Sequence, residues 1–321
     1  MRPIRKNFQS QGLSEHTVNV IMNSWRKSTK LQYRPYIRLW IEYATNRCNY
    51  LSPSIAQVVE FLSQLHQKKY TYYQLCMARS AISNIVVCKD NVPLGKQLLV
   101  KRFMKGVFEM NPHFPRYRYV WDVSLVLNYF RSLPKPKYLP MGLLGKKLAM
   151  MLVILAGGQR CQTIHAIDTL HIKVTHDKCF IPLYSTLKQT RHGHHLKPLE
   201  FQIYAKEPKL CVIENLTQYL KKTSKVRQEK QLFISYQKPH RGVSKDSIAR
   251  WCKEVMTNAG IDMTSFVSHS SRSAASSYAH AKGASLKDIC AACGWATEKT
   301  FALHYKKRIL NNKDITTRIL H

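Results

Sequence analysis

Residues 269–305 read HSSRSAASSYAHAKGASLKDICAACGWATEKTFALHY, and this stretch decides how the rest of the chain is interpreted. His269 and Arg272 lie at an expected helix start, where the helix dipole favours an anion and serine hydroxyls can cap free backbone N–H groups. Gly294-Trp295 and then Tyr305 follow about two helices later. A histidine and an arginine at a helix start are, taken alone, most often a cap and a surface charge.

A second arginine lies upstream, in Gly157-Gly158-Gln159-Arg160, where a glycine pair places it just after a buried helix. Two arginines, a histidine, a tryptophan and a tyrosine brought together would bind a phosphate and set a nucleophile beside it.

The ordered set resembles the tyrosine recombinase (phage integrase) family, whose catalytic order is Arg, Lys, His-x-x-Arg, His or Trp, then Tyr. The positions that match this order are Arg160, Lys188, His269, Arg272, Trp295 and Tyr305. The resemblance covers essentially the whole chain. It implies an N-terminal helical domain that clamps DNA and a catalytic domain with a small sheet.

Three strings are closer still to the recombinases of DIRS- and Ngaro-type retrotransposons and of Crypton elements. They are GQRCQTIHAID at 158–168, LKQTRHG at 187–193 and AACGWATEKTF at 291–301. This resemblance implies an enzyme that integrates or excises a mobile element, and the nucleus as its place of action.

The chain departs from the family pattern at two places. The gap from Trp295 to Tyr305 is one residue longer than in common bacterial members, which makes His304 and Tyr305 neighbours. The position three residues after the first arginine is often acidic in the family, and here it is Thr163. Lys178 and Lys197 lie in the same expected sheet region as Lys188, so the sequence leaves open which lysine acts.

The resemblance implies a role for each residue type. Arg160 and Arg272 would hold the nonbridging phosphate oxygens and neutralise the charge that grows on them. Tyr305 would attack the phosphorus, while His269 takes its proton. Lys188 would protonate the departing 5′ oxygen, and the Trp295 indole would donate to a phosphate oxygen. No cofactor and no metal are expected.

The chain is expected to be mainly α-helical with a small antiparallel β-sheet, an α+β fold in two domains. Residues 1–110 are predicted to be a helical DNA-binding bundle, since apolar residues repeat at helical spacing in 18–25 and 55–62. Ser52-Pro53 is typical of a helix start, and further helices are predicted around 78–86 and over 96–109. Basic residues available to face phosphates are Lys27, Lys30, Arg34, Arg79, Lys101, Arg102 and Lys105.

Residues 111–120 contain two prolines and no helical period, so they are predicted to be an extended basic linker. The catalytic domain then covers 121–321. Asp122 can cap its first helix, 143–156 is a hydrophobic helix, and 170–204 alternates apolar and polar residues as a small antiparallel sheet does. Helices are predicted over 210–222, 244–258, 270–282, 285–293 and 297–308.

The charge balance points to nucleic acid. Fifty-one Lys and Arg against 18 Asp and Glu leave a formal charge of +33, which would cost stability without a polyanionic partner. An anionic membrane surface fits less well, because the basic residues are spread along the chain. The longest apolar stretch, 148–158, is too short to span a bilayer. We therefore expect double-stranded DNA as partner, no membrane, and self-association into a synaptic dimer or tetramer on DNA.

The nine cysteines are scattered and odd in number, which fits reduced thiols inside a cell. Cys290 and Cys293 are expected to pack within a helix. The alternative is a zinc site that they would share with His192, His194 or His195.

Two other functions remain open. A type IB topoisomerase resembles this family in its catalytic residues but reseals the same strand. A DNA-binding remnant of a mobile element would have lost catalysis. The tail 306–321 carries apolar and basic residues, and the family resemblance implies docking on a neighbouring subunit.

Overall fold

The computed structural model describes residues 2–88, 92–112, 118–190, 192–193 and 195–310. It divides the chain into two compact units, Met1–Pro115 and Arg116–His321. The division falls within the predicted linker 111–120. The part of the predicted docking tail from residue 311 onward lies outside the described residues.

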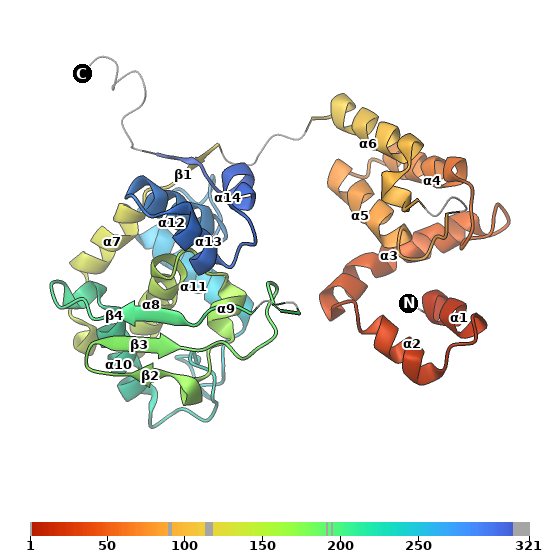
Figure 1. Ribbon diagram of the computed structural model, residues 1–321. Coiled ribbons are helices and arrows are strands. Elements are labelled where there is room, and N and C mark those ends of the chain that lie inside the picture. Colours follow the sequence, from red (N-terminus) through yellow and green to blue (C-terminus); the bar gives the residue numbers. More distant parts are fainter. Residues whose placement is uncertain (1, 89–91, 113–117, 191, 194, 311–321) are drawn as a thin grey trace, which may run out of the picture. The chain divides into compact units, whose positions relative to one another are not determined.

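Unit 1, Met1–Pro115, consists of helices (Figure 1). They are α1 (Arg2–Ser10), α2 (Glu15–Met22), α3 (Lys27–Ala44), α4 (Ile55–Gln67), α5 (Tyr72–Ile82), the 3-10 turn η1 (Leu94–Lys96) and α6 (Leu98–Met110). The pair α3 and α5 packs most extensively, and Trp40 of α3 is fully buried. The Trp40 indole lies edge-on to Phe61, with ring centroids 5.3 Å apart. Unit 1 thus has its own apolar core, and many of its basic side chains are exposed.

The helix boundaries of unit 1 correct two expectations. Helix α4 begins at Ile55 with Ser54 as its cap, because Ser54 and Gln57 satisfy each other's backbone N–H groups; the predicted start at Ser52 is wrong. Helix α2 ends at Met22, so Trp25 lies outside the helix in which its spacing placed it.

Unit 2 is mixed, and the expected mainly helical α+β fold is confirmed. Its helices are α7 (Val123–Ser132), α8 (Met141–Leu155), α9 (Cys161–His165), α10 (Val212–Thr223), α11 (Lys245–Asn258), α12 (Ser270–Ala281), α13 (Leu286–Cys293) and α14 (Glu298–His304). Its 3-10 turns are η2 (Pro136–Tyr138), η3 (Thr169–His171) and η4 (Pro208–Leu210). Its strands are β1 (Tyr119–Val120), β2 (Lys173–Val174), β3 (Lys178–Ile181), β4 (Leu199–Gln202) and β5 (Arg308–Ile309).

The core of unit 2 surrounds α8, which packs against α9, α10, α11 and α12. Asp122 caps α7 as predicted, with its carboxylate accepting the Ser124 N–H at 2.8 Å. The predicted antiparallel sheet is confirmed as β2-β3-β4, with Phe180 opposite Glu200. In Figure 1 this sheet lies beside α8. The long connection from β3 to β4 carries Lys188.

The end of unit 2 differs from the prediction. A helix over 297–308 is wrong at its C-terminal side, because α14 ends at His304 and the chain then forms strand β5. Strand β5 pairs in parallel with β1, with Arg308 opposite Tyr119 and Ile309 opposite Val120. The last strand described therefore closes on the first strand of the unit.

All nine cysteines are free thiols. Within the described ranges, no helix is both long enough and apolar enough to cross a bilayer.

Candidate active site

Arg272 is the buried centre of the candidate site. It lies in the first turn of α12, and only 1% of it is exposed. Its Nη1 donates to the Gly158 carbonyl at 2.7 Å, and its Nη2 donates to the Cys293 carbonyl at 2.6 Å. Burial, and then the charge of Arg160, lowers the pKa of Arg272. Two backbone carbonyls from separate segments therefore fix the direction of this guanidinium.

A glycine pair lets these segments approach. Gly157 and Gly158 have φ of +80° and +83°, a region that side-chain-bearing residues rarely adopt. A Cβ on Gly158 would lie 2.8 Å from the Arg272 carbonyl oxygen, and one on Gly157 would lie 2.7 Å from the Ala292 Cβ. The two glycines that were predicted to place Arg160 therefore also allow helices α12 and α13 to approach the backbone at residues 157–158.

Arg160 precedes α9 directly, and its carbonyl accepts the Thr163 N–H at 2.8 Å. Its Nη1 is buried and has no hydrogen-bond partner among the described residues. Thr163, which stands where the family often has an acidic residue, is itself buried. Arg160 lies close enough to Arg272 and His269 for its charge to lower the pKa of both.

Trp295 and Tyr305 form an aromatic stack against Arg272. Their ring centroids lie 4.3 Å apart with 30° between the ring planes. The guanidinium carbon of Arg272 lies 4.8 Å from the Trp295 ring centroid and 5.6 Å from that of Tyr305. Trp295 is 8% exposed, and its Nε1 is buried without a partner in the part of the chain that the structure describes. Cation–π contact thus joins one phosphate-binding candidate to the predicted nucleophile.

His269 stands immediately before α12, but its side chain does not cap the helix. The serines after it do not cap free N–H groups either, which corrects that expectation. Ser270 donates to the Val267 carbonyl at 2.7 Å and Ser271 to the Ser268 carbonyl at 2.6 Å, so both hydroxyls bond back to the turn that leads into α12.

Solvent reaches His269, yet the protein packed around its imidazole desolvates it enough to lower its pKa. Nearby positive charges lower the pKa further, and they belong to Arg272, Arg160 and Lys188. The imidazole is thus held neutral in a cationic neighbourhood.

Lys188 reaches this neighbourhood on the connection between β3 and β4. The residue is exposed, while Leu187 before it is buried and Gln189 after it is anchored. Gln189 donates to the Gly294 carbonyl at 3.1 Å and also to the Cys293 carbonyl. The two alternatives to Lys188 are Lys178 on β3 and Lys197 before β4. Neither is among the charges that shift the pKa of His269.

Sequence reasoning missed the anchoring role of Gln189, although this amide directly follows the predicted lysine in the quoted string. Gly294 makes the contact possible, because it ends α13 with φ of +66° and a Cβ there would overlap the Leu196 side chain. Cys293 contributes too: its thiol donates to the Gly157 carbonyl at 2.7 Å, and burial raises its pKa to about 12.

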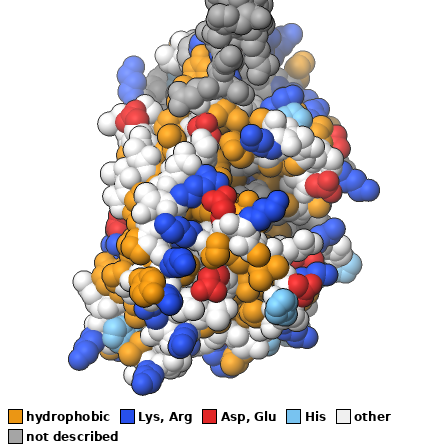
Figure 2. Space-filling view, turned by 90° about the vertical axis from the view of Figure 1, so that its left-hand side faces the viewer, with side chains coloured by type: hydrophobic (Ala, Val, Ile, Leu, Met, Phe, Trp, Pro, Cys, Tyr) orange, Lys and Arg blue, Asp and Glu red, His pale blue; other side chains and the backbone are white. Residues whose placement is uncertain are grey.

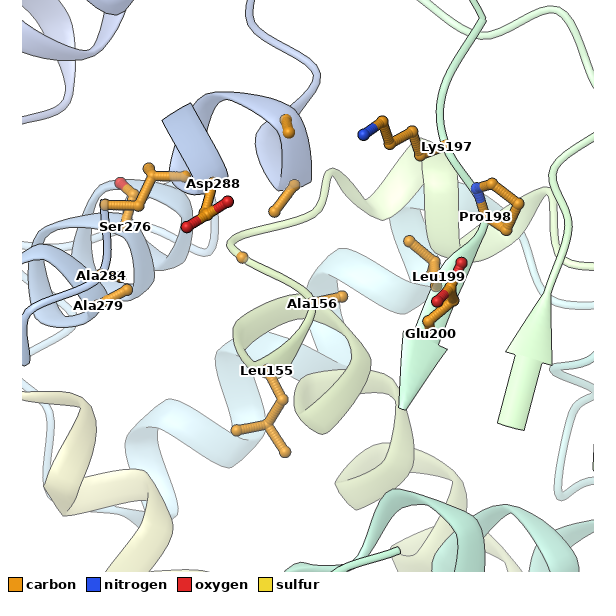
Figure 3. Close-up of a pocket in the computed structure, with 14 residues that line it drawn as sticks. Leu155, Ala156, Lys197, Pro198, Leu199, Glu200, Ser276, Ala279, Ala284 and Asp288 are labelled. Atoms are coloured by element: carbon orange, nitrogen blue, oxygen red, sulfur yellow. The ribbon is translucent and has the colours of Figure 1, made fainter. Parts of the chain in front are cut away.

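A cavity of about 450 Å³ lies behind the site, between the end of α8, strand β4 and helices α12 and α13 (Figure 3). Leu155 and Ala279 are among its apolar lining residues, and Lys197, Glu200 and Asp288 supply charged ones. None of the six predicted residues lines it. The candidate active site is therefore the cluster around Arg272, and Gly157, which lies next to that cluster, also lines this cavity.

The described residues contain no group of three or more His, Cys, Asp or Glu side chains that could hold a metal ion. Cys290 and Cys293 pack with Trp295 and Phe301 in one small apolar cluster. His194, one of the histidines of the zinc alternative, lies outside the described residues.

The model of the phage integrase family matches residues 144–308, which is more than half of the chain. The chain belongs to the phage integrase (tyrosine recombinase) family. No curated protein sequence matches it significantly.

Solved structures of integrases and recombinases share the fold. The Tn1549 transposon integrase in complex with circular intermediate DNA has a TM-score of 0.57 and 10% identity, covering 92% of this chain and 93% of that one. The XerH site-specific recombinase in a pre-cleavage complex with difH substrate has a TM-score of 0.53 and 12% identity, covering 78% and 67%. A lambda integrase dimer bound to a COC' core site has a TM-score of 0.51 and 14% identity, covering 98% and 97%.

Proposed function

We propose that this tyrosine recombinase cuts and rejoins DNA strands through a covalent 3′-phosphotyrosine on Tyr305. One observation carries the proposal. Three buried donors of the cluster around Arg272 have no hydrogen-bond partner among the described residues, namely Arg160 Nη1, Arg272 Nε and Trp295 Nε1. Because a buried donor without a partner is costly, such a set indicates a ligand with acceptor oxygens. A phosphodiester supplies them.

The arrangement suits attack on phosphorus. The two guanidiniums bind the nonbridging oxygens and neutralise the charge that develops as phosphorus becomes five-coordinate. The Tyr305 oxygen forms a bond to phosphorus as the bond to the 5′ oxygen breaks. Neutral His269 accepts the phenol proton, and Lys188 gives a proton to the departing 5′ oxygen. A 5′ hydroxyl from a second strand then reverses these steps, so no external energy source is needed.

We propose that this chemistry needs no metal and no cofactor, because Arg160, Arg272 and Lys188 supply the positive charge that metal ions provide elsewhere. The reaction is then expected to persist in a chelator.

DNA is the proposed partner, and the charge distribution supports it. Lys and Arg side chains are spread over the face of unit 2 in Figure 2, and Asp and Glu are fewer there. Unit 1 exposes Lys27, Arg34, Lys101, Arg102 and Lys105 on helices α3 and α6. We propose that unit 1 is the DNA-clamping domain, that unit 2 is the catalytic domain, and that two or four copies assemble on DNA for strand exchange.

The biological setting is a further part of the proposal. The strings around Arg160, Lys188 and Trp295 support a recombinase of the DIRS, Ngaro or Crypton kind. Such an enzyme would integrate or excise a mobile element in the nucleus.

Two alternatives give different products. A type IB topoisomerase would relax plasmids as a monomer without recombinants, and an inactive remnant would bind DNA without any covalent adduct. The test is a suicide DNA duplex with a nick near the cleavage site, incubated with the full chain in EDTA. We expect a protein–DNA adduct that maps to Tyr305 and is absent from Tyr305→Phe. An adduct on Tyr278 or His304, or strict dependence on a divalent metal, would contradict the mechanism.

A further inference from the structure

Ser277 in α12 forms hydrogen bonds with the backbone of the short segment from Tyr305 to Lys307. Its hydroxyl donates to the Tyr305 carbonyl at 2.9 Å and accepts the Lys307 N–H at 3.1 Å. The residue is 4% exposed, so water does not compete freely for these contacts. A single hydroxyl thus uses its donor and its acceptor on two backbone groups of one short segment.

The segment 305–307 lies between helix α14 and strand β5, and these two elements have different backbone partners. Upstream, α14 ends with the Tyr305 N–H bonded to the Phe301 carbonyl at 2.9 Å. Downstream, β5 is paired with β1, and the Leu310 N–H bonds to the Val120 carbonyl at 2.7 Å. Ser277 joins the part between them to α12.

Helix α12 is also the element that carries Arg272 and follows directly on His269. The Ser277 contacts therefore link the backbone of Tyr305 to α12, the helix that carries Arg272. Its neighbour Ser276 is fully buried too, but its hydroxyl donates to the Arg272 carbonyl at 2.8 Å, within the same helix. The hydroxyl of Ser276 thus bonds within α12, whereas that of Ser277 bonds to the segment 305–307.

A buried hydroxyl needs partners wherever it lies, so hydrogen bonding alone would be consistent with a role in folding only. The partners of Ser277, the Tyr305 carbonyl and the Lys307 N–H, indicate a role beyond folding. Removing the hydroxyl takes a donor from the Tyr305 carbonyl and an acceptor from the Lys307 N–H, which frees the segment to shift relative to Arg272. A displacement of about 1 Å at a reacting group can slow a reaction by about 10²-fold.

We propose that Ser277 is a positioning residue that holds Tyr305 in line with the phosphate bound by Arg160 and Arg272. This inference rests on the proposed function. It concerns the backbone beside the nucleophile, and Ser277 itself touches no reacting atom.

The test compares Ser277→Ala, Ser277→Thr and Ser276→Ala with the wild type on the nicked suicide duplex. Single-turnover adduct formation is measured at saturating DNA, and the dissociation constant for DNA is measured separately. We expect Ser277→Ala to slow adduct formation by about 10- to 100-fold with DNA affinity unchanged. Ser277→Thr keeps a hydroxyl and should recover most of the rate, while Ser276→Ala should stay within a few-fold of wild type.

A second measurement does not depend on activity. Amide hydrogen exchange at Lys307 should be faster in Ser277→Ala than in the wild type and in Ser276→Ala, because the N–H loses an acceptor. The inference is overturned if Ser277→Ala forms the adduct at the wild-type rate, if Ser276→Ala is equally slow, or if Lys307 exchange does not change. If the wild type itself forms no adduct, the proposed function fails and the inference fails with it.

Discussion

The Trp295 indole lies against the Tyr305 ring with centroids 4.3 Å apart, and its buried N–H has no partner among the described residues. The indole therefore has two separable properties: its ring packs against Tyr305, and its N–H is the proposed donor to a phosphate oxygen.

Substitutions at Trp295 separate these properties. Trp295→Phe keeps an aromatic ring but removes the donor, so we expect little change in thermal stability and adduct formation slowed by about 10²-fold, as for a lost oxyanion donor. Trp295→His restores an N–H and should recover part of the rate. Wild-type cleavage by Trp295→Phe would show that the indole N–H does not bind the phosphate.

Lys188 is expected to act on the leaving group alone. Lys188→Ala should slow cleavage of ordinary DNA by about 10² to 10⁴, with affinity nearly unchanged. A substrate with sulfur at the bridging 5′ position needs no proton on its leaving group. It should be cleaved at similar rates by the wild type and Lys188→Ala, whereas Arg160→Ala and Arg272→Ala should stay defective. Rescue of a variant at Lys178 or Lys197 instead would move the acid to that position.

The lowered pKa of His269 predicts the pH profile. A base must be neutral, and a lowered pKa keeps the imidazole neutral to a lower pH than usual. The acid limb of kcat/KM for adduct formation should therefore lie below the ordinary histidine value of 6.5. In Lys188→Ala, measured on the sulfur substrate, one positive charge is gone and the limb should move to higher pH. An acid limb that lies above 6.5 in the wild type would contradict this assignment.

Gly158 is predicted to tolerate no side chain. Gly158→Ala adds the strain of φ +83° and a Cβ 2.8 Å from the Arg272 carbonyl oxygen. We expect a loss of about 1–3 kcal/mol in the free energy of unfolding and failure to form the adduct. Gly260→Ala is the matched control, because Gly260 has φ of +79° but nothing within 4 Å of its Cβ. If thermal unfolding and adduct yield are the same in both variants, close approach to Arg272 is not what requires the glycine.

Salt should weaken DNA binding steeply, because a formal charge of +33 implies that many phosphates are neutralised on binding. For roughly six to ten neutralised phosphates the affinity should fall by about 10³ to 10⁵ between about 50 and 200 mM salt. Replacing Lys101 and Arg102 on α6 with glutamate should make the logarithmic salt slope shallower, by about one for each phosphate that is no longer neutralised. A wild-type slope that corresponds to only about one or two phosphates would argue against binding dominated by the DNA backbone.

The residue types that gather around Arg272 could be predicted from the catalytic order of the family that the sequence resembles, and the small sheet from its period-two alternation. The helix α3 was not predicted, since Pro35 lies inside it and interrupts the usual signal. The contacts of Gln189 could not be predicted either. They are made to the Cys293 and Gly294 carbonyls, whose position depends on how α13 ends.

The helix predicted through Arg308 failed for a related reason. The helix ends at His304, and Arg308 and Ile309 then pair with Tyr119 and Val120. Local periodicity contains no information about a strand so far away in the sequence.

That pairing has a consequence for the order of folding. Strand β1 opens unit 2 and β5 follows Tyr305, so the pair closes a loop that contains almost the entire unit. Contacts between residues so distant in sequence carry a large loop-closure entropy cost and tend to form late. The segment that carries Tyr305 is therefore expected to reach its place beside Arg272 late in the folding of unit 2, after the core around α8 has formed.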